Sequence, residues 1–274
     1  MNGLRMTYSF IVNHPCSQGR VMRNLARFVG WQLYSRIVSR PLPFVMAGTA
    51  RLHAAKGIWG ATGNLYVGLH EFQEMAFALH FLRSQDLFVD GGANIGSYTV
   101  LGLSLGAHVI AFEPSPDAFA WFTRNAALNA TGIADLRQQA LSDSPGVTYL
   151  TEGRGPQNQI SDAGTIRVTK VRLDDALKGV APTIMKLDLE GHTTMALQGA
   201  DAALKDLTLK CVIIEAEQED GEILKAYGFT PHTYDPWTRS LSADEAATLY
   251  VRDVAYVTDR CAQAPAFLTH GHLI

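Results

Sequence analysis

The chain has 274 residues, of which 47% are hydrophobic and 18% are charged, and this composition is typical of a globular protein with a sizeable core. A net charge of -3 does not indicate any strongly charged partner. The three widely spaced cysteines exclude a disulfide framework and a cysteine metal site. Without a signal peptide or a bilayer-length apolar run, we expect a cytoplasmic protein, and a transit peptide is the alternative.

The N-terminal segment is basic. No acidic residue precedes Glu71, whereas eight basic residues do: Arg5, Arg20, Arg23, Arg27, Arg36, Arg40, Arg51 and Lys56. The apolar spacing between Gly19 and Arg40 predicts one or two amphipathic helices, which Pro41 and Pro43 end. We interpret residues 1–80 as a basic extension that caps the functional site of the domain that follows. Its arginines are expected to be solvated, and the alternative is a weak contact with an anionic membrane surface or an acidic partner.

The segment that follows leads into the main domain. Met46–Gly68 is rich in glycine and predicts short strands or loops, and Glu71–Leu82 has the apolar spacing of a helix. We place the start of the main domain at residue 81 and its end at residue 274.

From Asp86 onward, strands and helices alternate. Predicted strands occupy Leu87–Asp90, Ala107–Glu113, Asp135–Gln139, Val147–Thr151, Ile166–Arg172, Thr183–Asp188 and Leu209–Glu217. Predicted helices lie between them at Gly96–Leu105, Pro116–Ala130, Asp175–Lys178, Thr194–Leu207 and Asp220–Tyr227. Two final strands, Thr230–Tyr234 and Leu249–Tyr256, follow each other without a helix. The pattern predicts an α/β fold with a mostly parallel sheet and an antiparallel pair at one edge.

A glycine-rich loop joins the first strand to its helix. The loop runs from Asp90 to Gly96, and its glycines allow a sharp turn close to a ligand. The next strand ends in Glu113, whose carboxylate is suited to accept hydrogen bonds from both ribose hydroxyls of a nucleotide. Together the loop and the acid predict a nucleotide site.

Two enzyme classes share this arrangement. Dehydrogenases usually carry Gly-x-Gly-x-x-Gly, but Asn94 stands where that spacing requires glycine. An acid that ends the first strand, as Asp90 does, is more typical of methyltransferases. The residues therefore favour a methyltransferase, with an NAD-dependent oxidoreductase and an inactive methyltransferase-like module as alternatives.

At these positions the sequence resembles the FkbM family of methyltransferases. The resemblance rests on six ordered motifs: Val89–Gly96, Ala111–Pro116, Asn125 with Leu128 and Asn129, Ala140–Asp143, Leu173–Asp175 and Met185–His192. Gly91 departs from the family pattern, which commonly has a β-branched residue there, and should slightly loosen the loop.

The resemblance implies a class I, Rossmann-like methyltransferase fold with a seven-stranded sheet and S-adenosylmethionine as the cofactor. It also implies methyl transfer to a hydroxyl oxygen of a sugar, a polyketide or a similar small molecule, and not to a nucleic acid. The residues that it assigns to the methionine and ribose end are Asp90, Gly92, Asn94 and Gly96. Glu113 is assigned to the ribose, and Leu141 and Ser142 to the adenine.

The end of the strand at Thr183–Asp188 carries the candidate catalytic residues. Asp188 is a candidate to contact the methionine amino group or the acceptor, and His192 is the best candidate base because its unperturbed pKa lies near neutrality. The alternative is that His192 only caps a helix or binds water. Lys186 and Glu190 are expected to form an ion pair at the strand end, and a chemical role is the alternative for them.

Two further expectations concern metal and acceptor. We expect no metal, the alternative being Mg²⁺ held by Asp188 with Glu215 or Glu217. Acceptor specificity is expected from the N-terminal segment and from Pro231–Leu241, where Trp237 and Arg239 either contact the substrate or anchor a hairpin. The candidate lid residues are Trp59, Asn64, Tyr66, His70 and Glu71.

Overall fold

A computed structural model describes residues 2–38, 40–58, 60–129, 131–151, 159–161, 163–215 and 218–274. Its main sheet has eight strands in the order β12-β11-β13-β10-β9-β3-β4-β5. The five strands from β10 to β5 are parallel, and β13, β11 and β12 pair antiparallel at one edge. The α/β fold with an antiparallel edge is confirmed, with one strand more than the seven predicted. In chain order the strands are β3 (Leu87–Gly91), β4 (His108–Phe112), β5 (Ile133–Arg137), β9 (Ile184–Leu187), β10 (Cys211–Ile214), β11 (Thr230–Asp235), β12 (Ser240–Ala243) and β13 (Leu249–Val251).

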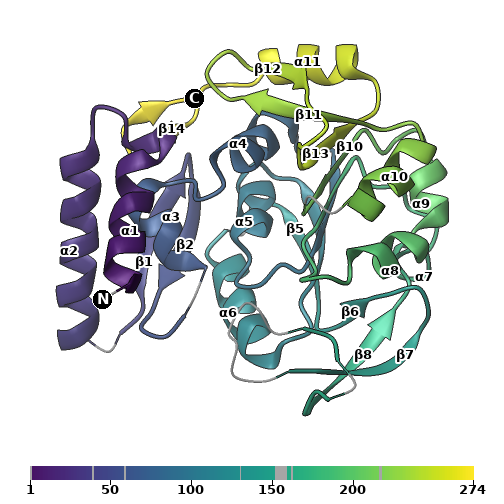
Figure 1. Cartoon of the computed structure of the whole chain (residues 1–274), viewed down its shortest axis with the longest axis horizontal. Coiled ribbons are helices and arrows are strands. Elements are labelled where there is room, and N and C mark those ends of the chain that lie inside the picture. The colour runs from purple at the N-terminus through teal and green to yellow at the C-terminus, as the bar shows by residue number, and fades with distance from the viewer. Residues whose placement is uncertain are drawn as a thin grey trace.

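Helices cover both faces of this sheet because successive strand residues point to opposite sides. In β4, for example, Val109 and Ala111 join one apolar core, whereas Ile110 and Phe112 join the other. The first core contains side chains of α4 (Phe72–Phe81), α5 (Ser97–Ser104), α6 (Pro116–Ala127) and α11 (Val254–Ala262). The second contains side chains of α7 (Leu173–Leu177), α8 (Thr193–Gln198), α9 (Asp201–Lys205) and α10 (Gln218–Ala226). Figure 1 shows α5 and α6 on one side of this sheet and α8 and α9 on the other.

The predicted last strand, Leu249–Tyr256, is too long. Strand β13 ends at Val251, and α11 begins at Val254. Asp253 occupies the N-cap with a φ of 62°, and its side chain accepts a hydrogen bond from the N–H of Tyr256. This cap fixes the start of a helix where apolar alternation predicted a strand.

Two predicted strands lie outside the main sheet. Strand β7 (Gly146–Leu150) and strand β8 (Ile166–Val171) pair with each other and with the short β6 (Ala140–Leu141) in a separate three-stranded sheet. This small sheet stands next to the carboxyl ends of the main parallel strands, and Leu141, Leu150 and Ile166 border the same cavity as Glu113.

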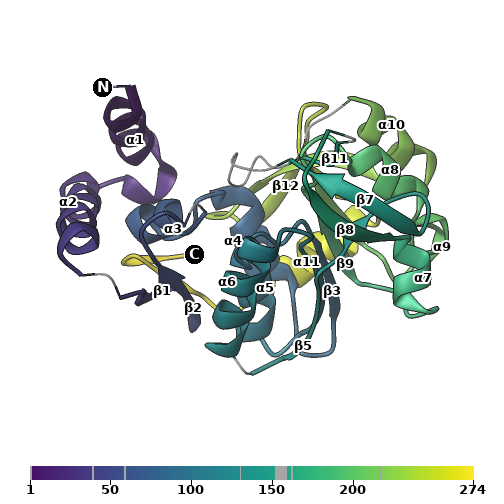
Figure 2. The same ribbon diagram turned by 90° about the horizontal axis from the view of Figure 1, so that it is seen from below.

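The first part of the chain forms a separate layer that we call the N-terminal module, residues 2–67. It contains α1 (Asn2–Asn13), a 3-10 turn (Pro15–Ser17), α2 (Val21–Ile37), β1 (Leu42–Ala47), β2 (Ala50–Ala54) and α3 (Ala61–Val67). Helices α1 and α2 lie at one end of the molecule (Figures 1 and 2). Of the helices in the described residues, none is long and apolar enough to cross a bilayer. The helix predicted between Gly19 and Arg40 is confirmed, whereas α1 and α3 were not predicted.

The C-terminus returns to this module. Strands β14 (Leu268–Thr269) and β15 (His272–Leu273) form a small hairpin beside β1. The Gly48 N–H donates to the Leu268 carbonyl, and the Thr269 hydroxyl donates to the Met46 carbonyl. The two ends of the chain are therefore hydrogen-bonded to each other across the predicted domain boundary at residue 81. The division into domains stays a prediction.

Two buried asparagines of the α6 region bind the module to the main domain. The Asn129 side chain exchanges two 2.8 Å hydrogen bonds with the backbone N–H and C=O of Arg51 on β2. The Asn125 amide oxygen accepts from the His53 N–H, and its NH₂ group donates 2.8 Å to the carbonyl of Ile95. Side-chain amides thus satisfy the free edge of β2 in place of another strand.

Candidate active site

The glycine loop between β3 and α5 packs directly on the end of β9. Gly92, Asn94 and Gly96 have φ angles of 72°, 52° and 88°, and the Gly92 N–H donates 2.9 Å to the carbonyl of Phe112 on β4. A Cβ atom at Gly92 would lie 1.9 Å from the Asp188 carbonyl oxygen. Glycine is therefore required at position 92 by backbone conformation and by space, as the loop motif predicted.

The Glu113 carboxylate at the end of β4 is fixed by two backbone groups. Its two oxygens accept hydrogen bonds of 2.8 Å from the N–H groups of Asn94 and Ser115. The side chain is only 7% exposed, and burial raises the pKa of its carboxyl to about 7. Each carboxylate oxygen has two acceptor sites, so both retain capacity for a ligand hydroxyl.

A cavity of about 480 Å³ opens beside this carboxylate, a volume suited to a small-molecule ligand. Six predicted site residues line it: Gly92, Asn94, Glu113, Leu141, Asp188 and His192. The other three predicted site residues, Asp90, Gly96 and Ser142, are not in the cavity wall. Asp90 and Ser142 are each 1% exposed. Gly96, at the start of α5, packs against Phe122 of α6.

Buried charges lie directly behind the loop. The Lys186 ammonium, on a side chain 6% exposed, contacts the Asp188 carboxylate at 3.0 Å and lies 4.9 Å from the centre of the Tyr98 ring. Burial opposes the charge on Lys186, but the nearby Asp188 and Asp90 carboxylates outweigh it and raise its pKa. Lys186 therefore pairs with Asp188, and the predicted ion pair of Lys186 with Glu190 was wrong.

Asp90 supports the loop from beneath. One of its oxygens accepts a 2.6 Å hydrogen bond from the Thr99 hydroxyl on α5, and Oδ1 has no hydrogen-bond partner among the described residues. Burial raises the pKa of this carboxyl. The acid thus connects the end of β3 to the first turn of α5, and it does not reach the cavity wall.

His192 is the N-cap residue of α8 and lines the cavity. Its Nε2 lies 3.2 Å from the Ser142 hydroxyl, and its side chain makes no capping hydrogen bond to the helix. Burial lowers the pKa of the ring, as does the positive charge of Lys170. The imidazole is therefore neutral at neutral pH and has a nitrogen that is able to accept a proton.

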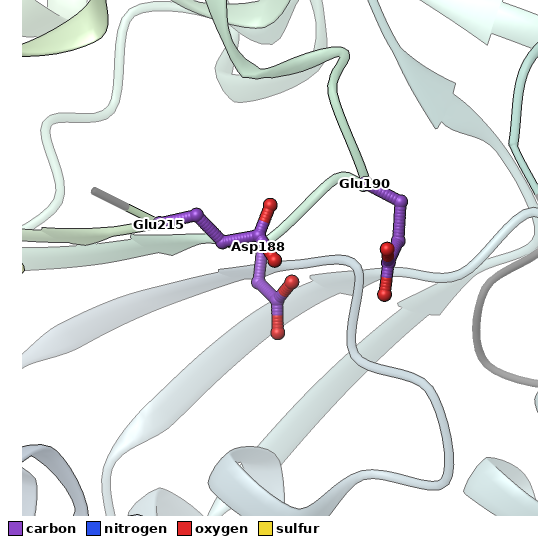
Figure 3. A group of neighbouring side chains, drawn as sticks. All are labelled: Asp188, Glu190 and Glu215. Carbon is purple, nitrogen blue, oxygen red and sulfur yellow. The ribbon is translucent and has the colours of Figure 1, made fainter. Parts of the chain in front are cut away.

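Three carboxylates gather at the ends of β9 and β10 (Figure 3). One oxygen each from Asp188, Glu190 and Glu215 lie within 4.8 Å of one another, and Asp188 is hydrogen-bonded to Glu215. Burial and the repulsion of its two acidic neighbours raise the pKa of Glu215 to about 7. The set has the oxygen ligands that Mg²⁺ prefers, but Lys186 already compensates Asp188. The expectation of a metal-free site stays a prediction, and Glu217 lies outside the described residues.

Several residues of the cavity wall were not predicted. Trp121 and Arg124 come from α6, and the Arg124 guanidinium lies 5.1 Å from the centre of the Trp121 ring. Gly57 and Ile58 come from the N-terminal module. The sequence does carry a signal for Trp121 and Arg124. They are an aromatic and a basic residue three positions apart on the helix that follows Glu113.

Of the two expected acceptor segments, the N-terminal one contributes Gly57 and Ile58 to the cavity wall, whereas Pro231–Leu241 does not line the cavity. Arg239 donates hydrogen bonds to the carbonyls of Ala264 and Ile274, so it anchors the C-terminal segment, as the structural alternative predicted. Trp237 packs on Phe72.

Four of the five candidate lid residues contact other parts of the chain, and the lid itself stays a prediction. Asn64 accepts a hydrogen bond from the His70 N–H, Tyr66 packs on Phe28, and Glu71 accepts from the Tyr98 hydroxyl. None of the lid residues that the structure describes lines the cavity. Trp59 lies outside the described residues.

Comparison with known proteins gives one family and one curated relative. The family model described as the methyltransferase FkbM domain matches residues 90–240, more than half of the 274 residues. The hexuronic acid methyltransferase AglP of Haloferax volcanii is 27% identical over an alignment of 148 residues, and the match covers 52% of this chain and 62% of that protein. The chain therefore matches less than two thirds of that relative's length.

Solved structures resemble the chain only weakly. A methyltransferase dependent on S-adenosylmethionine from Agrobacterium tumefaciens is 10% identical with a TM-score of 0.42, covering 69% of this chain and 57% of that one. An RNA methyltransferase from Salinibacter ruber in complex with S-adenosylhomocysteine is 14% identical with a TM-score of 0.36, covering 66% and 88%. At these scores the structural likenesses add nothing to the match with the family model.

Proposed function

We propose that this chain, which belongs to the FkbM methyltransferase family, transfers a methyl group to a hydroxyl oxygen of a small, carbohydrate-like acceptor. Family membership rests on the match over residues 90–240. This match argues against the alternative that the chain is an NAD-dependent oxidoreductase. S-adenosylmethionine is the cofactor. The observation that carries the proposal is the Glu113 carboxylate, fixed by two N–H groups in the wall of a cavity that the glycine loop also lines.

The residues present fit an adenosyl cofactor. Gly92 leaves no room for a Cβ between the loop and β9, so the backbone itself forms the cavity wall there. Glu113 offers free acceptor capacity for ribose hydroxyls, and Leu141 supplies an apolar surface for a base. Asp188 presents a carboxylate to the cavity, suited to a cationic amino group. When bound, S-adenosylmethionine supplies a methyl group on a positively charged sulfur.

The chain's own residues position the acceptor and remove its proton. An acceptor hydroxyl must lose its proton when its oxygen takes up the methyl group that the bound cofactor would supply, so a base is needed in the cavity wall. We assign that proton to Nε2 of His192, because the ring is neutral and lies in the cavity wall beside Ser142. Asp188 is the weaker base, since the charge of Lys186 lowers its pKa against the effect of burial.

Two residues of α6 support a sugar acid as the acceptor. Trp121 offers an aromatic face and Arg124 a guanidinium in the same cavity wall, and no ion pair within the described ranges involves Arg124. Sugar rings stack on aromatic faces, and arginine binds carboxylates through two parallel hydrogen bonds. The AglP relative is named for a hexuronic acid, which has both a sugar ring and a carboxylate.

The test is a methyl-transfer assay with isotopically labelled donor on paired acceptors, a hexuronic acid glycoside and the corresponding neutral hexoside. We expect a labelled O-methyl product from the acid, identified by NMR, and weaker turnover of the neutral sugar. Arg124→Ala should raise the KM for the acid and leave the neutral sugar unchanged. Asp117→Ala, at another position of the cavity wall on α6, is the matched control. Label on nitrogen or carbon, or no product from any hydroxylated acceptor, would contradict the proposal.

A further inference from the structure

Helix α2 is apolar on two faces, of which only one is covered. On the inner face, Trp31 is 6% exposed, and Phe28 packs edge-on against Tyr66 with ring centres 5.3 Å apart. These contacts attach α2 to the rest of the N-terminal module. A helix that is apolar all round is normally covered all round, so the second face needs an explanation.

The second face is a continuous outward stripe. Met22 is 79% exposed, Val29 54%, Leu33 57% and Ile37 80%, and Ala26 is also exposed. Their spacing of i, i+4, i+7, i+11 and i+15 places all five on one side of the helix. We call these residues the α2 stripe. It extends over nearly the whole length of α2, which is about 25 Å for 17 residues.

Positive charge borders the stripe on both sides. At 3.6 residues per turn, Arg36 falls at one margin of the stripe and Arg23 at the other, and both side chains are exposed. No ion pair found among the described residues involves either arginine. The first 70 residues contain no acid that would neutralise them.

This pattern favours an anionic surface over a second copy of the chain. In a two-fold symmetric dimer the same patch meets itself, so the arginines of one α2 would face those of the other. An anionic bilayer instead accepts the apolar stripe below its headgroups, while the arginines reach up to lipid phosphates. A helix that lies flat in the interface needs no groove on its partner, and the four large side chains of the α2 stripe are each more than half exposed.

We propose that α2 docks this protein on the surface of an anionic phospholipid bilayer, with the α2 stripe inserted at the headgroup boundary and Arg23 and Arg36 on lipid phosphates. This is a peripheral contact in which the helix lies in the membrane plane. The inference is independent of the methyl-transfer proposal, since it uses no residue of the cavity. It has one consequence for the site, because the module that carries α2 also supplies Gly57 and Ile58 to the cavity wall.

The experiment is vesicle co-sedimentation of the full chain, with vesicles of phosphatidylcholine alone or of phosphatidylcholine mixed with phosphatidylserine. We expect binding to the anionic vesicles that weakens at high salt, and at least about tenfold weaker binding to the neutral ones. Val29→Asp combined with Leu33→Asp should weaken anionic binding by at least about tenfold, since two apolar side chains are lost from the interface. Val180→Asp combined with Leu207→Asp, at sites 55% and 70% exposed elsewhere, is the matched control and should bind as the wild type does.

Three outcomes overturn the proposal. They are no binding of the wild type to anionic vesicles, equal binding by the α2 variant and its control, and a dimer in light scattering that the α2 variant dissociates. The last outcome assigns the stripe to a second copy. Circular dichroism checks that the α2 variant is folded. If it is not, Arg23→Glu with Arg36→Glu keeps the stripe apolar and should weaken binding to anionic vesicles by about fivefold or more per arginine.

Discussion

The charged groups at the carboxyl ends of β3, β4 and β9 are buried and paired, whereas the outer face of α2 exposes both its apolar side chains and its charges. We call these strand ends the donor edge. At the donor edge, charged groups are buried and paired: Lys186 contacts Asp188, and Glu113 accepts two backbone hydrogen bonds. On α2, apolar side chains are exposed and the arginines beside them have no acid near in sequence. Buried, paired charge is positioned to act on a ligand inside the chain, whereas uncovered apolar surface bordered by charge indicates a partner outside it. Substitutions at the two regions should therefore differ in what they disturb.

The largest effect is expected at His192. If its ring accepts the hydroxyl proton, His192→Ala should lower the single-turnover rate by about 10²–10⁴-fold and leave donor binding unchanged. Because burial lowers the pKa of this histidine below 6.5, the wild-type rate should stay level through pH 6.5 and decline only at more acidic pH. Rapid-quench measurements across pH test this, with His108→Ala on β4 as the control histidine. Identical pH profiles for wild type and His192→Ala would remove the base assignment.

The next effect concerns the stability of the glycine loop. Gly92→Ala should lower the free energy of unfolding by about 2–5 kcal/mol, because a left-handed φ costs roughly 1–2 kcal/mol and the clash with the Asp188 carbonyl adds to it. Gly191 also has a positive φ, of 84°, but open space around it, so Gly191→Ala should cost only about 1–2 kcal/mol. Urea denaturation separates the two variants, and equal losses would show that the close approach to β9 is not a constraint.

Donor affinity should depend on Glu113 and on pH. Glu113→Ala should weaken binding of S-adenosylmethionine by roughly 1–3 kcal/mol, measured by calorimetry, since hydrogen bonds to a charged acceptor are lost. Because burial raises the pKa of this carboxyl to about 7, its charged form decreases as the pH falls below 7, and wild-type affinity should fall with it. Glu219→Ala, an exposed acid of α10, is the control. Affinity of Glu113→Ala equal to that of the wild type would refute the ribose assignment.

The smallest effect on folding is expected on the outer face of α2. Leu33 is 57% exposed, so Leu33→Ser should change the free energy of unfolding by no more than about 0.5 kcal/mol. Trp31, on the inner face of the same helix, should cost about 3–5 kcal/mol when replaced by alanine. A large loss for Leu33→Ser would mean that the outer face is packed within the chain, and the contrast between the two regions would fail.

The core of the donor edge could be predicted because its constraints are local. A buried strand, a glycine turn and an acid at the next strand end are contiguous in sequence, and parallel pairing of β3 with β4 brings them together. Sheet membership could not be predicted in the same way. The alternation in β7 and β8 is equally compatible with either sheet, because pairing partners are set by long-range contacts. Asp253 was a capping signal whose effect the following apolar residues concealed.

The part of the cavity wall that we propose for the acceptor was harder to predict, since its residues come from separate layers of the fold. Trp121 and Arg124 are ordinary residues of an amphipathic helix until α6 is placed beside the loop that holds Gly57 and Ile58. Arg239 is a residue type that often contacts a substrate, but here both of its terminal nitrogens, Nη1 and Nη2, donate to backbone carbonyls near the C-terminus.

Asn125 makes the N-terminal module an energetic part of the donor site. One amide group holds the backbone of His53 with its oxygen and the carbonyl of Ile95, within the glycine loop, with its nitrogen. Removing the module would leave the Asn125 amide oxygen without the His53 N–H. The change would reach the glycine loop because the same amide group donates to the carbonyl of Ile95. Ligand affinity and attachment of the module are thus linked quantities: the free energy by which the attached module would tighten donor binding equals the free energy by which a bound donor would hold the module.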